Sequence, residues 1–375
     1  MEFRDLKKQY QVLKEEIDEG VIEVMTSGAF ILGKPVGELE EKLAAYTGRK
    51  HCVAVANGTD ALQLSLMAYD IGPGDAVFTS DFTYFASAGS ASILGATPVL
   101  VDIDLDTFNM SAEDLERRIQ AVLAEGKLKP KFVVPVDLFG LPADYTKILP
   151  VVEKYGLRVL EDAAQGFGGA IEGKRACSFG DISTTSFFPA KPLGCYGDGG
   201  AIFTDDDEID ARLRSLRAQG KSPEDKYDNR EIGMNSRLDT LQAAVLLPKL
   251  KAFEDYEVDA VNRVADAYTA ALKGKVVTPL VPEGFYSSWA QYTILLESRQ
   301  KRDSVQKALK EKGIPTMVYY PRGLHQQAAY KWMGLSDEEF PNTVKAASCV
   351  LSLPMHPYME EKEQKYIIES LLEVL

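Results

Sequence analysis

The sequence predicts an α/β fold, with a large domain built on a mainly parallel sheet and a smaller α+β domain at the C-terminus. Up to about residue 240, runs that are apolar almost throughout alternate with segments of helical period. This alternation is typical of buried parallel strands joined by helices. Beyond that point the elements are mixed, and no repeat or linker separates the two parts. We expect the large domain at residues 1–245, and a connecting helix with the small domain at 246–375.

Each element follows from its own pattern. Helices are predicted over residues 2–25 and 36–47, where apolar side chains recur every three or four positions. A helical pattern from Arg237 to Leu272 is interrupted by Pro248, since proline lacks a backbone donor. The predicted strands of the large sheet are Cys52–Ala56, Ala76–Ser80, Thr97–Ile103, Lys131–Val136, Leu157–Leu160, Ile182–Phe187 and Ala201–Thr204. The small domain contains predicted strands at Trp289–Leu296 and Thr316–Tyr320, a helix over 301–312 and a final helix.

Composition excludes several classes of protein. The 375 residues include 42 basic and 56 acidic side chains, a net charge of −14, whereas a general nucleic-acid binder needs a basic face. The start lacks the apolar core of a signal peptide, and no apolar run approaches the ~20 residues of a membrane span. The four cysteines form no CxxC pair and the three histidines lie far apart, so no metal site is predicted. We expect a cytoplasmic enzyme or binding protein.

One segment with polar residues joins a predicted strand to a helix, at the edge where open α/β sheets bind ligands. It reads Asn57-Gly58-Thr59-Asp60. Gly58 allows a tight turn, and the helix N-terminus offers N–H groups to an anion such as phosphate. An ordinary helix cap formed by Asn57, Thr59 or Asp60 is the alternative.

Two further segments supply an acid and a lysine. Glu161 and Asp162 end a buried strand, where a carboxylate needs a partner: a cationic ring nitrogen, or else an N-cap or a structural ion pair. Lys191 lies between two prolines and a glycine-rich stretch, and a lysine desolvated in such a loop attacks a carbonyl as a neutral amine. These glycines do not fit the dinucleotide fingerprint GxGxxG, which disfavours a nicotinamide enzyme.

Together these segments meet the requirements of pyridoxal 5′-phosphate (PLP). This cofactor needs a lysine, an acid that keeps the pyridine nitrogen protonated and a cup for the phosphate. An aromatic residue should also stack on the ring. Tyr84 and Phe85, which follow the next strand end, are the candidates, and packing in the core is the alternative for both.

Several motifs follow one another along essentially the whole chain: Asn57–Leu62, Glu161–Gln165, Ser186–Gly194, Tyr196–Ala201, Asn235–Asp239, Tyr320-Pro321 with His325-Gln326, and Leu353–Pro357. In this order they resemble the sugar-nucleotide aminotransferases of the DegT/DnrJ/EryC1/StrS family, which are PLP enzymes of fold type I. Within the family, the chain resembles bacterial enzymes that aminate the 3-keto group of UDP-2-acetamido-2-deoxy-3-oxo-glucuronate for O-antigen.

The resemblance implies a transaminase with a seven-stranded sheet in its large domain. It implies L-glutamate as amino donor, pyridoxamine phosphate as the form between half-reactions, and a homodimer with shared active sites. Lys191 would bond to the cofactor and move the proton, Asp162 would pair with the pyridinium nitrogen, and Gln165 would lie by the ring hydroxyl. Dehydratase relatives carry histidine in place of Lys191, so this lysine implies transamination.

The remaining implied residues fall into two groups. Around the cofactor, Gly58, Thr59, Ser186 and the neighbouring subunit's Asn235 would hold the phosphate, and Tyr84 would stack on the ring. Near the sugar, the matching positions are Gly28, Phe30, Arg237, Tyr319 and Tyr320. Arg237 would suit a carboxylate, of the uronate or of the amino donor, because its fork binds two oxygens.

Three departures from the family pattern concern the sugar. Ala190 stands where serine is frequent, Tyr319 where histidine is frequent, and Phe30 where a near relative has tyrosine. Each removes or changes a polar group, so a 4-keto-6-deoxy UDP sugar and a dTDP-linked 3-keto-6-deoxy sugar stay open as substrates. A PLP-binding regulator without turnover is the alternative of another class, and Lys191 argues against it.

Overall fold

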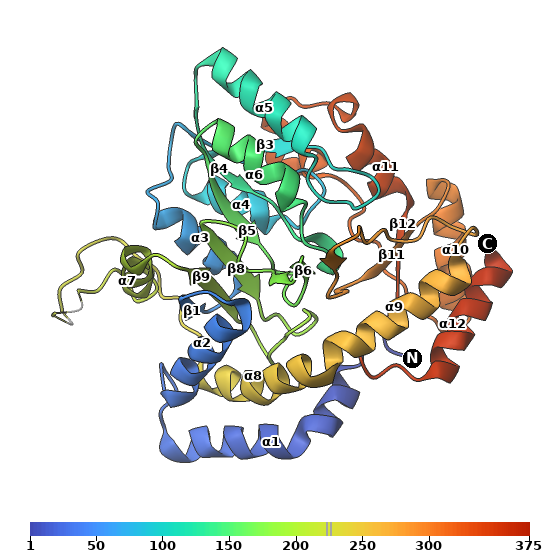
Figure 1. Ribbon diagram of the computed structural model, residues 1–375, viewed down its shortest axis with the longest axis horizontal. Coiled ribbons are helices and arrows are strands. Elements are labelled where there is room, and N and C mark those ends of the chain that lie inside the picture. Colours follow the sequence, from blue (N-terminus) through green and yellow to red (C-terminus); the bar gives the residue numbers. More distant parts are fainter. Residues whose placement is uncertain (223, 226) are drawn as a thin grey trace.

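A seven-stranded sheet forms the centre of the computed structural model, which describes residues 1–222, 224–225 and 227–375 (Figure 1). The strand order is β1-β9-β8-β5-β4-β2-β3. The bounds are β1 (His51–Val55), β2 (Asp75–Ser80), β3 (Thr97–Val101), β4 (Lys129–Val134), β5 (Arg158–Asp162), β8 (Ile182–Ser186) and β9 (Gly200–Thr204). β9 runs antiparallel to both its neighbours, whereas β8, β5, β4, β2 and β3 are parallel. The predicted mainly parallel sheet is confirmed.

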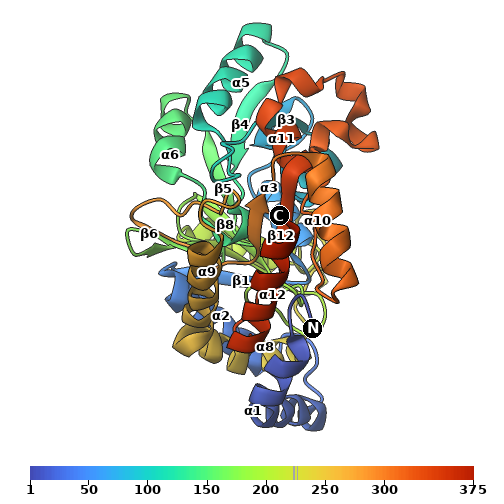
Figure 2. The same cartoon turned by 90° about the vertical axis from the view of Figure 1, so that its right-hand side faces the viewer.

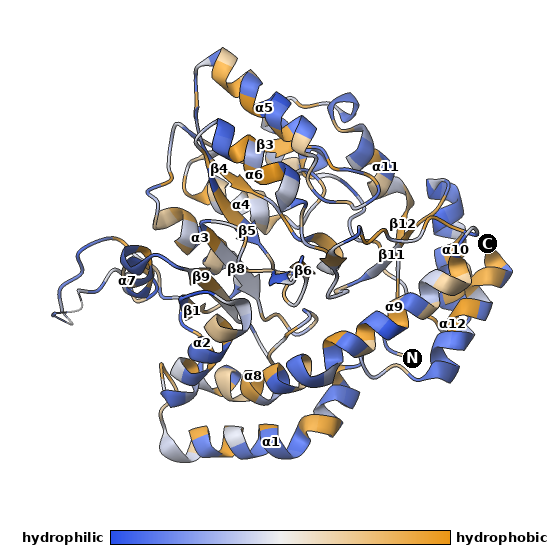
Figure 3. Ribbon diagram, viewed as in Figure 1, coloured by the Kyte–Doolittle hydropathy of each residue, from blue (hydrophilic) through white to orange (hydrophobic). Residues whose placement is uncertain are grey.

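Helices cover both faces of this sheet. On β1, Cys52 and Ala54 pack into one core and Val53 and Val55 into another on the opposite face. The covering helices are α2 (Lys34–Thr47), α3 (Gly58–Met67), α4 (Ala86–Ile93), α5 (Ala112–Glu125), α6 (Tyr145–Lys154) and α7 (Asp207–Leu216). Figure 3 shows the apolar residues concentrated on the strands and along one side of helices such as α5. This two-sided burial explains why several of the strands are apolar almost throughout.

The C-terminal part is built from helices around a short strand pair. α1 (Leu6–Ser27) packs along α8 (Thr240–Ala252), which leads through the π-helical turn η2 (Phe253–Glu257) into α9 (Val258–Leu272). Figure 2 shows α12 (Glu361–Val374) beside both α9 and α10 (Arg299–Glu311). The remaining elements are β11 (Tyr292–Leu295) paired with β12 (Val350–Leu353), β10 (Phe285–Tyr286) with β6 (Ala170–Ile171) and β7 (Lys174–Arg175), α11 (Pro341–Cys349), and the 3-10 turns η1 (Leu138–Gly140), η3 (Leu324–Gln326), η4 (Ala328–Met333) and η5 (Asp337–Glu339).

Two predicted elements were wrong. Pro248 lies inside α8, where packing of the helix in the core outweighs the missing donor, and the break comes later as η2. Residues 316–320 form no strand: in the described chain, Met317 alone pairs with β12, at Ser352. The segment then leaves β12 and enters the cavity described below. The division into domains at residue 245 stays a prediction. No helix within the described ranges is long and apolar enough to cross a bilayer.

Candidate active site

The predicted segments meet at the edge of the sheet where the parallel strands end. A cavity of about 360 Å³ opens there. Nine predicted residues line it: Gly58, Thr59, Tyr84, Asp162, Gln165, Ser186, Lys191, Tyr319 and Tyr320. A more open hollow of about 500 Å³ near Tyr46, Arg49 and Arg175 contains none of them. The chemistry-bearing residues therefore converge on one cavity.

The N-terminus of α3 forms one wall of this cavity. Asn57 Oδ1 accepts a hydrogen bond from the Asp60 N–H at 2.8 Å, so Asn57 is the helix cap. Gly58 lies so close to Ser186 that a Cβ at position 58 would be 2.7 Å from Ser186 Cβ. Glycine thus lets the start of α3 pack directly against the end of β8. This contact brings the helix N–H groups and the Ser186 hydroxyl together at the cavity wall, a combination that suits a phosphate.

The two acids that end β5 have different environments because successive side chains of a strand point to opposite faces. Glu161 is fully buried away from the cavity and accepts hydrogen bonds from the Cys177 N–H, the Phe179 N–H and Ser183 Oγ, at 2.6, 2.8 and 2.9 Å. Asp162 lines the cavity. Glu161 is therefore structural, and Asp162 is available to a ligand.

Asp162 is held in place by its own hydrogen bonds. Its Oδ2 accepts from Ser87 Oγ at 2.8 Å and its Oδ1 from the Ala164 N–H at 3.2 Å. Burial raises the pKa of Asp162 above its ordinary value, while the hydrogen bond from Ser87 and the charge of Lys191 oppose the shift. A buried carboxylate of this kind gains from a cationic partner in the cavity.

Lys191 enters the same cavity from the loop after β8. Its backbone N–H donates to the Phe188 carbonyl at 2.8 Å, which closes a tight turn. Burial lowers the pKa of the Lys191 amine, Asp162 opposes this shift, and the cation of Arg4 adds to it. Arg4 also donates a hydrogen bond to the Pro192 carbonyl at 3.1 Å, so the N-terminal segment braces the lysine loop. The arrangement favours a neutral, nucleophilic amine.

Two aromatic walls complete the cavity. Gln165 accepts from the Phe139 N–H at 2.8 Å and donates to Tyr320 Oη at 2.9 Å, which fixes both side chains. Of the two stacking candidates, Tyr84 lines the cavity, and Phe85 instead stacks on Tyr330 with ring centres 5.3 Å apart. The geometry thus favours Tyr84 over Phe85.

Four predicted residues do not line this cavity: Gly28, Phe30, Asn235 and Arg237. They gather around the start of α8. The Thr240 N–H donates to the Phe30 carbonyl at 2.9 Å, and Arg237 donates to Asn235 Oδ1 at 2.5 Å. Gly28, Phe30 and Asn235 are exposed on the surface. Within one chain they are separate from the residues around Lys191.

Sequence reasoning missed two residues at this site: Ser87, which supports Asp162 without lining the cavity, and Gln291, which lines it. Ser87 orients Asp162, but it lies in the run Ala86–Ser90 of small residues, which reads as an ordinary buried helix. Gln291 lines the cavity with a buried Oε1 that has no hydrogen-bond partner among the described residues. It falls within the predicted strand Trp289–Leu296, where nothing in the spacing distinguishes it. An orphaned buried acceptor at a cavity wall is a candidate contact for a ligand.

Known proteins resemble this chain over its full length. A 46% identical relative, UDP-2-acetamido-2-deoxy-3-oxo-D-glucuronate aminotransferase of Pseudomonas aeruginosa, aligns over 99% of both chains. A 43% identical relative from Geobacillus stearothermophilus, called pleiotropic regulatory protein, aligns over 98% of this chain and 97% of its own.

Solved structures share the fold as well. The crystal structure of a DegT DnrJ EryC1 StrS aminotransferase from Brucella abortus is 47% identical, has a TM-score of 0.96 and covers 100% of this chain and 99% of its own. NtdA from Bacillus subtilis with bound cofactor PMP is 30% identical, has a TM-score of 0.86 and covers 96% of this chain and 82% of its own. These likenesses confirm the predicted fold class. The model of the DegT/DnrJ/EryC1/StrS aminotransferase family matches residues 11–372, and the chain belongs to that family.

Proposed function

We propose that this chain is a PLP-dependent aminotransferase of a keto-sugar nucleotide, UDP-2-acetamido-2-deoxy-3-oxo-D-glucuronate, in the biosynthesis of a surface polysaccharide such as O-antigen. The observation that carries the reaction type is the meeting of Lys191 and Asp162 in one cavity beside the N-terminus of α3. The observation that carries the sugar is the 46% identity to an aminotransferase named for it.

The residues present fit PLP. The start of α3, packed against Ser186 through Gly58 and with Thr59 in its first turn, suits the phosphate. The Asp162 carboxylate suits the protonated pyridine nitrogen, and Lys191 suits the aldehyde carbon. Bound there, PLP would supply an electron sink for the carbanion that forms when a substrate C–H loses its proton.

The chain's own residues then divide the work. Asp162, held by Ser87, would keep its carboxylate against the ring nitrogen and so keep that nitrogen protonated. Lys191 Nζ, with its lowered pKa, would take the proton from the substrate carbon and return it at the next position. Gln165 would lie by the ring hydroxyl while it holds Tyr320. Tyr84 would stack on the ring at the mouth of the cavity.

We infer that L-glutamate is the amino donor. We also infer that the chain forms a homodimer in which both subunits contribute residues to each active site. Phe30, Ile31 and Leu32 form an exposed apolar run beside Asp239 and Thr240, just after Arg237 in the sequence, and an interface would cover this run. In such a homodimer Asn235 would reach the neighbouring subunit's phosphate. Gly28, Phe30 and Arg237 would reach its sugar from the same surface, while Tyr319 and Tyr320 contact the sugar from the cavity's own wall.

The test is a visible spectrum taken in two half-reactions. L-glutamate should bleach the absorbance of the yellow protein, and after removal of the donor the 3-keto uronate sugar, made in situ by its dehydrogenase, should restore it. Failure of glutamate to bleach the band would refute the donor. Bleaching without restoration would leave the aminotransferase and refute the sugar.

Other keto-sugars are separated by a panel and one variant. Arg237→Ala should impair turnover of the uronate sugar and leave a 4-keto-6-deoxy UDP sugar or a dTDP-linked 3-keto-6-deoxy sugar unaffected, since those lack a carboxylate. Equal loss on all substrates would place Arg237 at the amino donor instead. The alternative of another class, a PLP-binding regulator, would show no turnover with any sugar, and the presence of Lys191 in the cavity counts against it.

All four cysteines are free thiols, which agrees with our placement of the enzyme in the reducing cytoplasm.

A further inference from the structure

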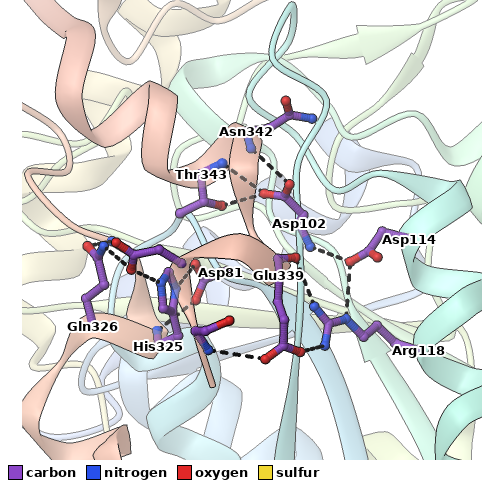
Figure 4. A network of polar contacts seen from close by, with 12 residues as sticks. Asp81, Asp102, Asp114, Arg118, His325, Gln326, Glu339, Asn342 and Thr343 are labelled. Atoms are coloured by element: carbon purple, nitrogen blue, oxygen red, sulfur yellow. Dashed lines mark hydrogen bonds and ion pairs between the residues drawn. The ribbon is translucent and has the colours of Figure 1, made fainter. Parts of the chain in front are cut away.

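A buried histidine connects two walls of the cavity, one that carries Tyr84 and one that carries Tyr320. This histidine has no part in the proposed chemistry. His325, in η3, is 5% exposed. Its Nδ1 lies 2.5 Å from Asp81 Oδ2, and its backbone N–H donates to Asp81 Oδ1 at 2.8 Å. On the other side its Nε2 lies 3.0 Å from Asp337 Oδ1 of η5. We call Asp81, His325 and Asp337 the His325 clasp, and Figure 4 shows His325 directed at Asp81.

The clasp requires a proton in each of its two ring contacts. A neutral imidazole carries one N–H and one lone pair, so it satisfies one carboxylate and repels the other. With both contacts protonated, the ring donates in both directions. Gly323 allows the approach, because a Cβ there would lie 2.3 Å from Asp81 Oδ2 and 2.9 Å from His325 Nδ1.

The charged groups around the clasp are themselves paired. The His325 ring stacks on Phe340 with centres 4.6 Å apart, and the guanidinium of Arg118 lies over the same Phe340 ring at 4.5 Å. Arg118, from α5, donates to Glu339 at 2.9 Å and also pairs with Asp114. Asp102 accepts hydrogen bonds from Asn342 and Thr343 of α11 (Figure 4). The carboxylates that contact the His325 ring are therefore Asp81 and Asp337.

Both walls of the cavity are attached to the clasp. Asp81 is followed by Phe82, Thr83 and Tyr84, and Phe82 packs edge-on against Tyr320 with ring centres 6.0 Å apart. Thr83 Oγ1 lies 3.4 Å from Ser87 Oγ, and this serine orients Asp162. On the other wall, η3 begins only four residues after Tyr320, and the Leu324 N–H donates to the Asp81 carbonyl at 2.8 Å.

We propose that His325 is a positioning residue: protonated between Asp81 and Asp337, it holds the wall that carries Thr83 and Tyr84 against the wall that carries Tyr319 and Tyr320. Loss of a clasp proton breaks one contact, loosens both walls and weakens binding of the cofactor. The inference rests on the proposed PLP cavity but not on the identity of the sugar.

The electrostatics agree in sign. Burial alone disfavours a charged ring, but the hydrogen bonds and charges of Asp81 and Asp337 outweigh it, so the pKa of His325 lies above its ordinary value of 6.5. The clasp's contribution to stability is complete below pH ~6.5 and is lost as pH rises through the raised pKa. Burial raises the pKa of Asp81 as well, against the opposing hydrogen bond from His325.

The test uses Asp337→Ala in the full chain, because Asp337 is exposed and its loss does not create a buried cavity. The matched control is Glu338→Ala, the same truncation of the neighbouring exposed residue of η5. Histidine Cε1 NMR titration gives the pKa directly: His51 is identified with His51→Gln, and burial lowers the pKa of His356 to about 4. Asp337→Ala should lower the pKa of His325, and Glu338→Ala should leave it near the wild-type value.

The functional readout is the dissociation constant of PLP from pH 6 to 9, expressed as the ratio of variant to wild type so that titration of Lys191 and of the cofactor cancels. The ratio for Asp337→Ala should be about fivefold at pH 6, the factor for one ordinary hydrogen bond, and should fall towards one above the wild-type pKa of His325, where the wild-type clasp has lost one contact as well. The ratio for Glu338→Ala should stay near one. A flat ratio for Asp337→Ala, or a His325 pKa at or below 6.5, would overturn the clasp. If the wild-type chain binds no PLP at any pH, the proposed cofactor is refuted, together with any effect of the clasp on cofactor binding. The NMR titration would still decide the protonation of His325.

Discussion

Substitution of Gly58 by alanine should weaken PLP binding while the chain stays folded. The added Cβ would lie 2.7 Å from Ser186 Cβ and 3.1 Å from Ser186 Oγ, and carbon atoms pack at 3.5–4.0 Å. About 1 Å must therefore open between the first turn of α3 and the end of β8. The free chain relieves this strain by shifting the helix end, but the phosphate needs both walls in their original places, so binding restores the strain.

The expected magnitude follows from the cost of overpacking. An extra methyl group in a well-packed site costs about 1–3 kcal/mol. If this cost returns on binding, the dissociation constant of PLP rises by about 5- to 150-fold, because 1.36 kcal/mol corresponds to a factor of ten. The assay is a spectroscopic titration of the apoprotein with PLP, together with the melting temperature of the apoprotein.

A matched glycine provides the control. Gly37 lies in α2 with nothing within 4 Å of its Cβ position, so Gly37→Ala should raise stability by about 0.5–1 kcal/mol and leave the dissociation constant unchanged. Equal PLP affinity in Gly58→Ala and wild type would refute the reasoning, because the contact between the start of α3 and Ser186 would then not position the groups that bind the phosphate. A large fall in melting temperature for Gly58→Ala would mean that the helix end cannot shift.

Three further predictions follow from buried charges. Lys191→Ala should retain PLP but lose ~10²–10⁴-fold or more of the turnover rate at an unchanged melting temperature, as measured by steady-state kinetics and calorimetry. Glu40→Gln should cost about 3–5 kcal/mol in urea unfolding, because Glu40 and Arg217 form a buried ion pair at 2.6 Å, whereas the exposed Glu38→Gln should cost at most about 0.5 kcal/mol. Burial lowers the pKa of His356 to about 4, so the unfolded chain binds a proton that the folded chain excludes, and about 3 kcal/mol of stability should disappear between pH 6.5 and pH 4. His356→Gln should flatten that part of the pH profile, and an identical acid profile in this variant would contradict the assignment.

Much of the fold could be predicted because its signals are local. Each of the seven strands of the large sheet overlaps an apolar run, and Lys191, Asp162 and Gly58 lie beside strand ends that topology brings to one edge. Together these segments indicated PLP, and the order of the motifs then indicated the family. These features depend on neighbours in sequence, so a single chain reveals them.

The rest depends on contacts between distant segments. Ser87 is an unremarkable helical serine until β5 places Asp162 beside it, 75 positions away. Likewise, His325 belongs to a sequence motif, but its partner Asp81 lies 244 positions earlier. The failed strand at 316–320 has the same origin. Its residues have β propensity, but Met317 alone of these five pairs with β12, and Tyr319 and Tyr320 line the cavity.

Glu161 and Asp162 are neighbours on β5, so the geometry of the cavity depends on Glu161 although this residue does not line it. A slip of β5 by one position would turn Asp162 away and bring Glu161 in, since side chains alternate with period two. The three hydrogen bonds of Glu161 to Cys177, Phe179 and Ser183 fit one alignment of β5 with its surroundings. Glu161 therefore acts as a register pin. Any attempt to transfer this site to another sheet has to include both acids, together with the two N–H groups and the hydroxyl that hold Glu161.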